Sequence, residues 1–346
     1  MIGIIVFGFI ITASSSPAIA KRIEVDKFFF LKKQILFIFC AASIIIAISF
    51  LDIRQIKLMA VVGICIIIAL LFLVLAIGSG IKGSKRWISI FGFALQPSEF
   101  AKIFFVIFHA YILNKFKNHE LLTKYSISLT LLIVIASLTV LEPDFGMTLT
   151  IAILWATQLF LYGISLIFIS FIGIVVAVGA VVAYVSLPHV EDRINKFLDS
   201  DNKSYQVERS LDAFVNGSFF GVGPGNGTVK QYIPDAHTDF VFAVIGEEYG
   251  IFGCIFLILL FSYLITRIVR YILDEEDLFS YIALSGLMVE FVFQTIVNMG
   301  VSLKLFPTKG MTLPFISYGG SSMIATAICF GLILAFTKKK YSRAKG

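Results

Sequence analysis

Long apolar runs recur along the whole of this chain, and they decide what it can fold into. Segments such as Leu58–Gly78 and Ile164–Ser186 match the roughly 20 residues that a helix needs to cross a bilayer. Of the 346 residues, 58% are hydrophobic and 14% are charged, whereas a soluble domain has about 25% charged residues. Inside a bilayer every backbone polar group needs a partner within the protein, so such runs fold as helices. The sequence therefore predicts an all-α, polytopic membrane protein.

About ten membrane spans account for the apolar runs, and we expect residues 1–346 to form a single integral membrane domain with one long extracytoplasmic loop, about 187–238. The first run, Ile2–Ala13, is short, and Ala18-Ile19-Ala20 imitates a signal-peptide cleavage site. No positively charged segment precedes it, so we favour a first membrane helix with a clipped or upstream start over a cleaved signal. The other predicted spans are about Ile35–Leu51, Leu58–Gly78, Glu99–Leu113, Ser126–Leu141, Phe145–Tyr162, Ile164–Ser186, Asp239–Ile265, Ser280–Val301 and Ser317–Phe336.

The distribution of basic residues leaves two interpretations of the orientation. Ten spans place both termini on one side, and the tail KKKYSRAK, residues 338–345, indicates that this side is the cytoplasm. On that topology more basic residues fall outside than inside, against the usual tendency. Either the orientation is inverted, or outward basic residues are retained because they bind an anion. The basic tail favours the second interpretation.

The junction QYIPDAHTDFVFAVIGEEYGIFG, residues 231–253, runs from a polar turn into an apolar helix. Thr238 is a suitable N-cap, which would place Asp239 in the first turn, where unpaired N–H groups and the helix dipole favour a carboxylate. Glu247 and Glu248 follow inside the apolar run. Because ionisable groups at membrane depth are expensive, we treat them as functional hypotheses.

The segment KRWISIFGFALQPSEFAK, residues 85–102, is the second candidate for chemistry. Ser98 can cap the helix that follows, and Glu99 and Lys102 fall three apart on one face of it. Arg86 is the better anion ligand, because a guanidinium can bind a phosphate through two parallel hydrogen bonds. An interfacial aromatic belt with a local Glu99–Lys102 pair explains the same segment about as well.

Glycine-rich and small-residue stretches occur in two further places. In the long loop, residues 217–227 suggest a phosphate-binding nest, although no Walker motif is present. In FPTKGMTLPFISYGGSSM, residues 306–323, small residues at a helix entrance offer backbone N–H donors to an oxygen-rich ligand; a kinked re-entrant turn is the structural alternative. Gly246 and Gly250 form a GxxxG step that predicts close helix packing.

Two other polar patterns have simple structural explanations. Glu290, Gln294 and Asn298 recur every four residues along an apolar helix. We interpret this stripe as hydrogen bonding between helices in preference to a conduction path. The acidic loop formed by residues 142–144 is interpreted as a turn between two helices. No metal-ligand spacing is present, and the four cysteines lie singly in apolar runs, so we expect neither disulfides nor a structural metal.

Taken together, these motifs resemble the successive signatures of the SEDS family (shape, elongation, division and sporulation), which includes FtsW and RodA. KRWISIFGFALQPSEFAK, EPDFGMTL, PDAHTDFVFAVIGEE and FPTKGMTLPFISYGGSS occur in the expected order, and the resemblance runs from the first span to Ser322. The segment SSSPAIAKRI…FFFLKKQ looks more like the FtsW branch than the RodA branch. The sequence departs from the family at Asp235, where many members have Glu, and at Met147, where Thr is frequent.

The resemblance implies a peptidoglycan glycosyltransferase that polymerises lipid II into β-1,4 glycan strands on the outer face of the cytoplasmic membrane during septal cell-wall synthesis. It assigns the essential acidic residue to Asp239, either as general base for a sugar hydroxyl or as a group that orients it. The implied partners are lipid II, a class B penicillin-binding protein with transpeptidase activity, other divisome proteins and membrane lipids, with no nucleic acid. The expected substrate-binding residues are Arg86, Gln96, Glu99, Lys102, Arg193, Tyr205, Gln206, His237, Thr238, Lys309, Ser317, Gly319, Gly320, Ser321 and Ser322.

Two other functions fit parts of the same pattern. A transporter that flips lipid II would also use polar stripes, Glu247 and Glu248 in membrane helices. A scaffold could recruit the transpeptidase without any chemistry of its own. The sequence does not decide between division and elongation, and it leaves open a divalent cation, Mg²⁺ or Mn²⁺, at the diphosphate of the substrate.

Overall fold

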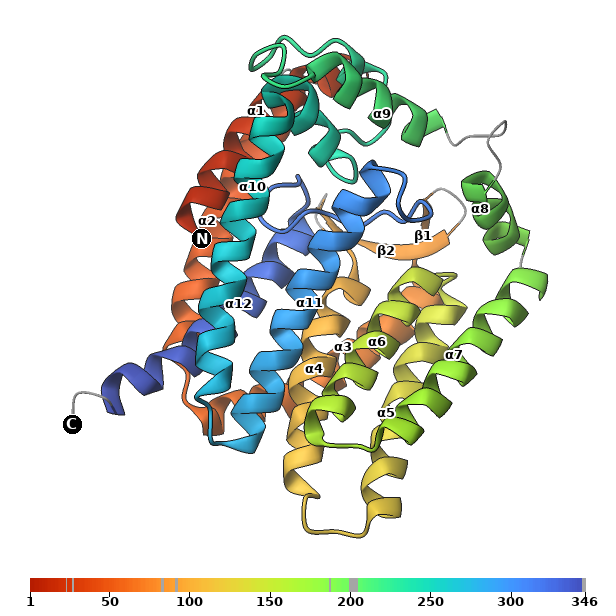
Figure 1. Ribbon diagram of the computed structural model, residues 1–346, viewed down its shortest axis with the longest axis vertical. Coiled ribbons are helices and arrows are strands. Elements are labelled where there is room, and N and C mark those ends of the chain that lie inside the picture. Colours follow the sequence, from red (N-terminus) through yellow and green to blue (C-terminus); the bar gives the residue numbers. More distant parts are fainter. Residues whose placement is uncertain are drawn as a thin grey trace. The chain divides into compact units, whose positions relative to one another are not determined.

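The computed structural model describes residues 1–22, 24–26, 28–81, 84–90, 93–186, 188–198 and 205–343 (Figure 1). Most of these residues are helical, and each predicted span overlaps one long helix. These helices are α1 (Ile2–Arg22), α2 (Phe29–Ser49), α3 (Ile53–Ile77), α4 (Pro97–Lys115), α5 (Leu121–Leu141), α6 (Phe145–Tyr162), α7 (Leu166–Ser186), α10 (Val241–Leu273), α11 (Leu278–Ser302) and α12 (Gly320–Arg343). The predicted all-α polytopic architecture is confirmed. In the described part of the chain, seven helices are long and apolar enough to cross a membrane.

Several short elements were not predicted. The long loop contains α8 (Pro188–Leu198), α9 (Tyr205–Gly217) and the 3-10 helix η1 (Val229–Gln231). A small antiparallel sheet precedes α4, with strands β1 (Ser79–Ile81), β2 (Ser84–Ile90) and β3 (Phe93–Leu95) in the order β1-β2-β3. Strands of three to seven residues give a weak sequence signal, because too few residues alternate to distinguish them from a polar-aromatic loop.

The chain folds into two compact units built from interleaved segments. Unit 1 contains Met1–Ile38, Ser170–Ile265 and Val292–Gly319. Unit 2 contains Phe39–Ile169, Thr266–Phe291 and Gly320–Gly346. The candidate residues from the sequence are divided between the two units.

The interior of unit 2 is a helix bundle in which several buried polar groups satisfy one another. His109 on α4 lies 2.9 Å from Oε1 of Gln158 through Nδ1 and 2.6 Å from Oγ of Ser128 through Nε2. Gln158 uses its Nε2 to donate to the carbonyl of Val106, so its oxygen must face His109. Trp155 donates its indole N–H to Ser128. This network ties α4, α5 and α6 together and accounts for the buried histidine as a structural residue.

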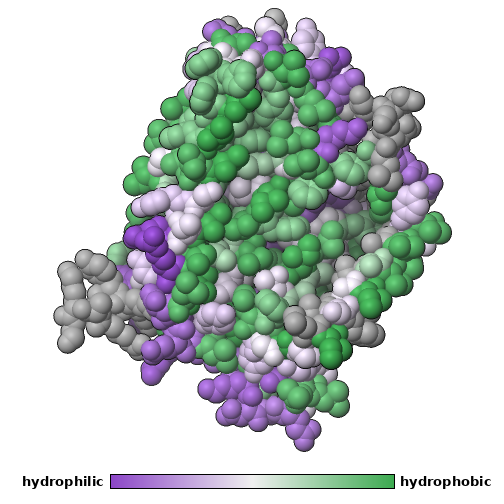
Figure 2. All heavy atoms as spheres, viewed as in Figure 1, coloured by the Kyte–Doolittle hydropathy of each residue, from purple (hydrophilic) through white to green (hydrophobic). Residues whose placement is uncertain are grey.

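In unit 1, α10 is broken at Gly250, where φ is 65° and ψ is −165°. The loop after α9 supplies the missing backbone partners: Val222 and Gly223 donate their N–H groups to the carbonyls of Glu247 and Glu248 at 3.0 Å. On the other side of the break, Ile251 donates to the carbonyl of Ser218 at 3.0 Å. The predicted close approach at Gly250 is therefore real, but the loop after α9 is the partner, not another membrane helix. Beyond the break, exposed apolar residues line α10, and Figure 2 shows hydrophobic residues over much of the visible face.

Replacement of Gly250 by alanine should destabilise the protein, because its Cβ would lie 2.3 Å from the carbonyl oxygen of Phe219. The positive φ alone costs an L residue about 1–2 kcal/mol, and the contact with main chain adds to it. Gly225→Ala is the matched control, since Gly225 has φ +82° but open space around its Cβ position. We expect thermal unfolding in detergent to show a loss for Gly250→Ala that exceeds the control by roughly 2 kcal/mol. Equal losses would show that the docked loop does not constrain the break.

Candidate functional site

Asp239 lies in a turn that precedes α10, and the prediction that it occupies the first helical turn is wrong. The helix begins at Val241. The N–H groups of Thr238, Asp239 and Phe240 all donate to the carbonyl of Asp235, at 3.0, 3.0 and 3.4 Å. Thr238 is not the N-cap, because its hydroxyl donates to the same carbonyl at 3.1 Å. These bonds close a separate turn and move the start of the helix two residues on.

Three consecutive carbonyl groups of this turn are held by three donors. The carbonyl of His237 accepts from the N–H of Tyr318 at 2.8 Å. That of Thr238 accepts from the hydroxyl of Ser317 at 2.5 Å, and that of Asp239 accepts from Nδ2 of Asn298 at 2.9 Å. Ser317 also accepts from the N–H of Leu313 at 2.8 Å. The main chain that carries the half-buried carboxylate of Asp239 is therefore fixed along its length.

His237 packs into an aromatic cluster in unit 1. Its ring centroid lies 4.8 Å from that of Phe30 and 5.3 Å from that of Tyr318. Burial lowers the pKa of His237 to about 4, against a smaller opposing effect of Asp235. Burial also raises the pKa of Tyr318 to about 12. Near neutral pH both groups are therefore uncharged, so His237 can accompany Asp239 as a neutral hydrogen-bonding group but not as a cation for a diphosphate.

The second candidate segment lies in unit 2, where Lys102 is 1% exposed and pairs with two carboxylates. Its Nζ lies 3.1 Å from Glu99 and 3.1 Å from Glu290. The predicted Glu99–Lys102 pair is present, and Glu290 of α11 is a further partner. Contact between Lys102 and a diphosphate would require this triad to open. The predicted cap at Ser98 is wrong, because α4 starts at Pro97 and the N-cap residue is Gln96. Proline is favourable at the first position because it has no N–H to satisfy.

Arg86 on β2 holds the loop between α5 and α6. Its guanidinium donates to the carbonyls of Glu142, at 3.3 Å, and of Pro143, and lies 3.6 Å from the carboxylate of Asp144. Asp144 in turn caps α6 by accepting from the N–H of Met147 at 3.2 Å. The guanidinium is thus engaged within unit 2, and phosphate binding by Arg86 stays a prediction.

Glu142 should make stability pH-dependent. Its carboxylate is 0% exposed, and no hydrogen-bond partner of either oxygen is found among the described residues. Burial, with a contribution from Asp144 and partial compensation by Arg86, raises its pKa from 4.5 to about 8. Between these values the folded protein keeps a proton that the unfolded chain releases, so stability falls as the pH rises from 4.5 to 8.

Glu142→Gln should therefore flatten that dependence. Thermal unfolding at pH 5 and pH 8 should show that wild type loses roughly 2–4 kcal/mol more than the variant over this interval. Both forms keep the main-chain carbonyl that Arg86 contacts, so the comparison isolates the carboxyl group. Parallel curves for the two proteins would show that Glu142 titrates normally.

The small residues at the start of α12 also have structural partners. Ser321 accepts from the N–H of Gln96 at 3.0 Å and donates to the carbonyl of Ala94 at 3.2 Å, which fixes the connection from β3 to α4 in unit 2. Ser322 is buried, whereas Gly320 is half-buried. In unit 1, Gly319 is also half-buried.

The long loop contributes α9 to unit 1. Tyr205 is 49% exposed at its first turn, followed by the half-buried Gln206. Ser210 donates to the carbonyl of Ser302 at 2.7 Å, which ties α9 to the end of α11. Arg193 lies in α8, and its side chain is outside the described residues. Binding roles for Arg193, Tyr205 and Gln206 stay predictions.

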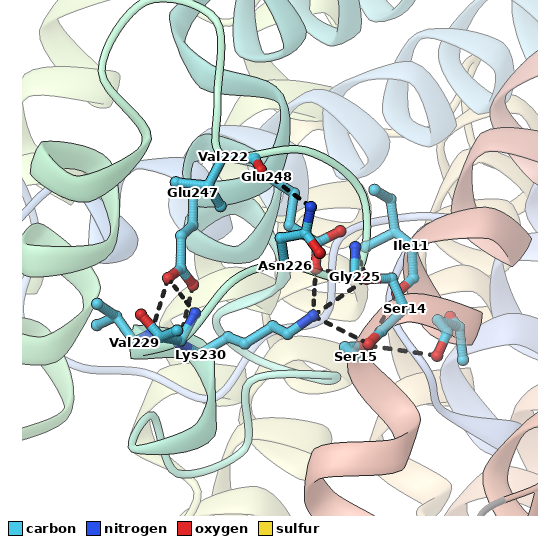
Figure 3. Close-up of polar contacts among 12 residues, drawn as sticks. Ile11, Ser14, Ser15, Val222, Gly225, Asn226, Val229, Lys230, Glu247 and Glu248 are labelled. Atoms are coloured by element: carbon cyan, nitrogen blue, oxygen red, sulfur yellow. Dashed lines mark hydrogen bonds and ion pairs between the residues drawn. The ribbon is translucent and has the colours of Figure 1, made fainter.

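A backbone nest forms in the long loop at residues 228–230, just after the predicted stretch 217–227, and a carboxylate of the protein occupies it (Figure 3). Glu247 accepts from the N–H groups of Thr228, Val229 and Lys230 at 2.7, 2.7 and 2.8 Å and from Nδ2 of Asn216 at 2.8 Å. In the predicted stretch itself, the N–H groups of Val222, Gly223 and Gly225 donate to oxygen atoms of the protein, so these residues do not form an open phosphate-binding nest. The geometry of the occupied nest suits an anion, and α10 supplies that anion from within unit 1.

Glu248 completes the network in Figure 3 by joining three elements. Its Oε1 accepts from Nζ of Lys230 on η1 and from the hydroxyl of Ser14 on α1. Lys230 also donates to the carbonyl of Ser14 at 3.1 Å. The two acidic residues predicted to be functional because of their depth are thus explained by contacts that hold the loop on α10 and α1.

Sequence reasoning missed two residues that contact Asp239. The sequence predicts that Asn298 hydrogen-bonds to another helix, whereas its partners are the main-chain carbonyls of Asp239 and Met311. Gly310 received no role, although a Cβ there would lie 2.7 Å from Oδ2 of Asp239. No group of three or more His, Cys, Asp and Glu side chains suited to a metal occurs in the part of the chain that the structure describes.

The structure thus defines a polytopic, helical membrane protein whose candidate carboxylate sits on a rigid turn at the start of a broken helix. A family model described as cell cycle protein, covering FtsW, RodA and SpoVE, matches residues 1–342. The chain belongs to this FtsW/RodA/SpoVE family.

Individual relatives agree with that assignment. The chain is 35% identical over 343 residues to a protein of Caulobacter vibrioides named probable peptidoglycan glycosyltransferase FtsW, covering 97% of this chain and 87% of that protein. A protein of the same name from Trichlorobacter lovleyi is 36% identical, with 95% and 88% covered.

Solved structures give the same picture. A chain from a peptidoglycan synthase complex, studied for coordination of polymerization and crosslinking, superposes with a TM-score of 0.81 at 27% identity, covering 98% of this chain and 96% of that chain. The rod shape determining protein RodA of Thermus thermophilus gives a TM-score of 0.72 at 25% identity, with 98% and 94% covered.

Proposed function

We propose that this protein is a peptidoglycan glycosyltransferase that polymerises lipid II into β-1,4 glycan strands. The observation that carries the proposal is the half-exposed carboxylate of Asp239 on a turn whose three carbonyls are all fixed. A group that must meet a substrate hydroxyl within hydrogen-bond distance benefits from such a rigid support. The names of the relatives, which share this chain's family, indicate the same reaction class.

In the proposed reaction, the 4-hydroxyl of the acceptor sugar attacks the anomeric carbon of the donor. The new O–C bond forms as the bond from that carbon to the diphosphate breaks, and the bonding electrons leave with the polyprenyl diphosphate. Asp239 accepts the hydroxyl proton or orients the hydroxyl as it attacks. Attack from the opposite face converts an α-linked donor into a β-linked product. A diphosphate can leave without protonation, so a second carboxylic acid of the kind that glycosidases use is not needed.

The reaction also requires that the negative charge on the departing diphosphate be neutralised, and cationic side chains can do this. Lys309 is the strongest candidate in unit 1, because it directly precedes Gly310, which lies against the carboxylate of Asp239. Arg86 and Lys102 are weaker candidates, since both already contact oxygen atoms of unit 2.

We extend the proposal to partners and location. The protein would act as one integral membrane domain with Asp239 on the outer face of the cytoplasmic membrane, at the division septum. Its partners would be a class B penicillin-binding protein and other divisome proteins. The related chain in a peptidoglycan synthase complex supports a transpeptidase partner of this kind.

The test is glycan synthesis by the purified protein together with its transpeptidase partner. Lipid II is added in detergent, and glycan chains are separated on a gel. Chain formation supports the proposal, whereas flipping of lipid II in liposomes without chain formation would support a transporter. The transporter is the weaker candidate, because Glu247 and Glu248 are bound by η1, α1 and Asn216. Localisation of a labelled protein at midcell tests the division role.

A further inference from the structure

Asn298 lies at the point where α11 meets the turn that carries Asp239. Its Nδ2 donates to the carbonyl of Asp239 at 2.9 Å and to the carbonyl of Met311 at 2.6 Å. Both acceptors are main-chain oxygens, so the orientation of the amide is determined and its nitrogen must face them. The side chain is 0% exposed. One buried amide therefore joins α11, the turn of Asp239 and the loop before α12.

The other end of the same amide indicates that stability alone does not explain Asn298. Its Oδ1 is buried and has no hydrogen-bond partner among the residues that the structure describes. A buried acceptor without a partner costs free energy. Side chains that break such a rule are often found where function needs a specific contact. Here the specific contacts are the two hydrogen bonds that Nδ2 donates to the carbonyls of Asp239 and Met311.

Gly310 confines the carboxylate from another direction. A Cβ at this position would lie 2.7 Å from Oδ2 and 3.3 Å from Cγ of Asp239. The carboxylate therefore packs against the main chain of the loop between α11 and α12. Asn298 fixes the backbone of Asp239, and the bare main chain at Gly310 leaves the space in which its side chain lies.

We propose that Asn298 is a positioning residue that orients Asp239 for its encounter with the acceptor hydroxyl, with Gly310 preserving the space beside the carboxylate. This inference rests on the proposed role of Asp239. Asn298 acts through the main chain of Asp239 and does not touch the substrate. A misplacement of a catalytic group by about 1 Å can cost on the order of 100-fold in rate. Loss of Asn298 should therefore lower kcat and leave KM for lipid II nearly unchanged.

The experiment compares Asn298→Ala and Asn298→Asp with Gln294→Ala in the purified complex with its transpeptidase partner. Gln294 lies one turn earlier on α11 and donates to the carbonyl of Thr312 at 2.9 Å, so its loss weakens the same loop and leaves both hydrogen bonds of Asn298 in place. We expect kcat to fall at least 10-fold for both Asn298 variants, with KM within about 2-fold of wild type. Gln294→Ala should keep wild-type kcat. Equal kcat losses for Gln294→Ala and Asn298→Ala at equal thermal stability would overturn the inference.

A second pair of variants separates this inference from the proposed function. Gly310→Ala should lower kcat because its Cβ displaces the carboxylate of Asp239. Adding Asn298→Ala to Asp239→Asn should cause no further loss, since residues that act through one group are not additive. An inactive Asp239→Asn together with a fully active Asn298→Ala would overturn the positioning role alone. Wild-type activity of Asp239→Asn would overturn the proposed role of Asp239, whereas absence of chain formation by the wild-type complex would overturn the proposed function itself.

Discussion

We expect glycan synthesis to fall by about 10²- to 10⁴-fold when Asp239 is replaced by asparagine, the range that a positioned general base contributes. Asparagine has nearly the same size as aspartate, and the main-chain carbonyl of residue 239 that accepts from Asn298 is unchanged. The turn should therefore stay folded. What it loses is the ability to take a proton. The measurement is the initial rate of chain formation from lipid II, with binding of lipid II determined separately and expected to be retained.

Asp235→Asn is the matched control for this prediction. Asp235 lies in the same turn, and its carbonyl rather than its carboxylate accepts the N–H groups of Thr238, Asp239 and Phe240. Its φ of 56° lies in the left-handed region, which asparagine tolerates better than most residues. The control should keep activity close to wild type. If Asp239→Asn and Asp235→Asn lose activity equally, the loss is caused by the reduced negative charge of the turn and not by a specific role of Asp239. If Asp239→Asn keeps full activity and binds lipid II normally, Asp239 has a purely structural role.

The membrane helices could be predicted because hydropathy and length determine them independently of their neighbours. The span Phe145–Tyr162 was predicted with the same limits as α6, where Asp144 caps the helix through a local hydrogen bond. The start of α10 could not be predicted, because a turn closed on the carbonyl of Asp235 precedes the helix, and distant groups hold that turn. Thr238 is a plausible N-cap in isolation, but Ser317 and Asn298 hold the carbonyls of the preceding turn. These contacts join residues 59 and 79 positions apart.

The chemical character of the candidate residues was accessible from sequence, but their partners were not. Charge and spacing indicated the pair of Lys102 with Glu99, whereas Glu290 joins it from a helix almost 190 positions later in the chain. The glycines of residues 217–227 pointed to an anion-binding nest, and a nest forms directly after them, at residues 228–230. Only the fold shows that Glu247 occupies it. The sequence therefore identified charged and hydrogen-bonding groups that need a partner, whereas the packing of the helices determined which partner each group contacts.

Replacement of Lys230 by methionine should destabilise the protein by about 3–5 kcal/mol, the usual result of removing one member of a buried ion pair. Lys230 is 4% exposed and its Nζ pairs with Glu248, which is fully buried. Methionine fills most of the same volume, but it leaves the carboxylate of Glu248 without its counter-charge. The measurement is the free energy of unfolding by denaturant in detergent, at a pH near 7.

The double variant Lys230→Met with Glu248→Met should recover much of this loss, because desolvation of two charges offsets most of the attraction between them. Asp26→Asn is the exposed comparison: Asp26 and Lys32 form an ion pair at 2.8 Å with both side chains largely in solvent, so no measurable change is expected. If the double variant is less stable than either single variant, the network of η1, α10 and α1 would depend on its charges for stability. If stability recovers, the Lys230–Glu248 pair is better explained as a contact that specifies where the loop docks. In any other arrangement of the loop, one of the two charges would be buried without its partner, at a cost in free energy.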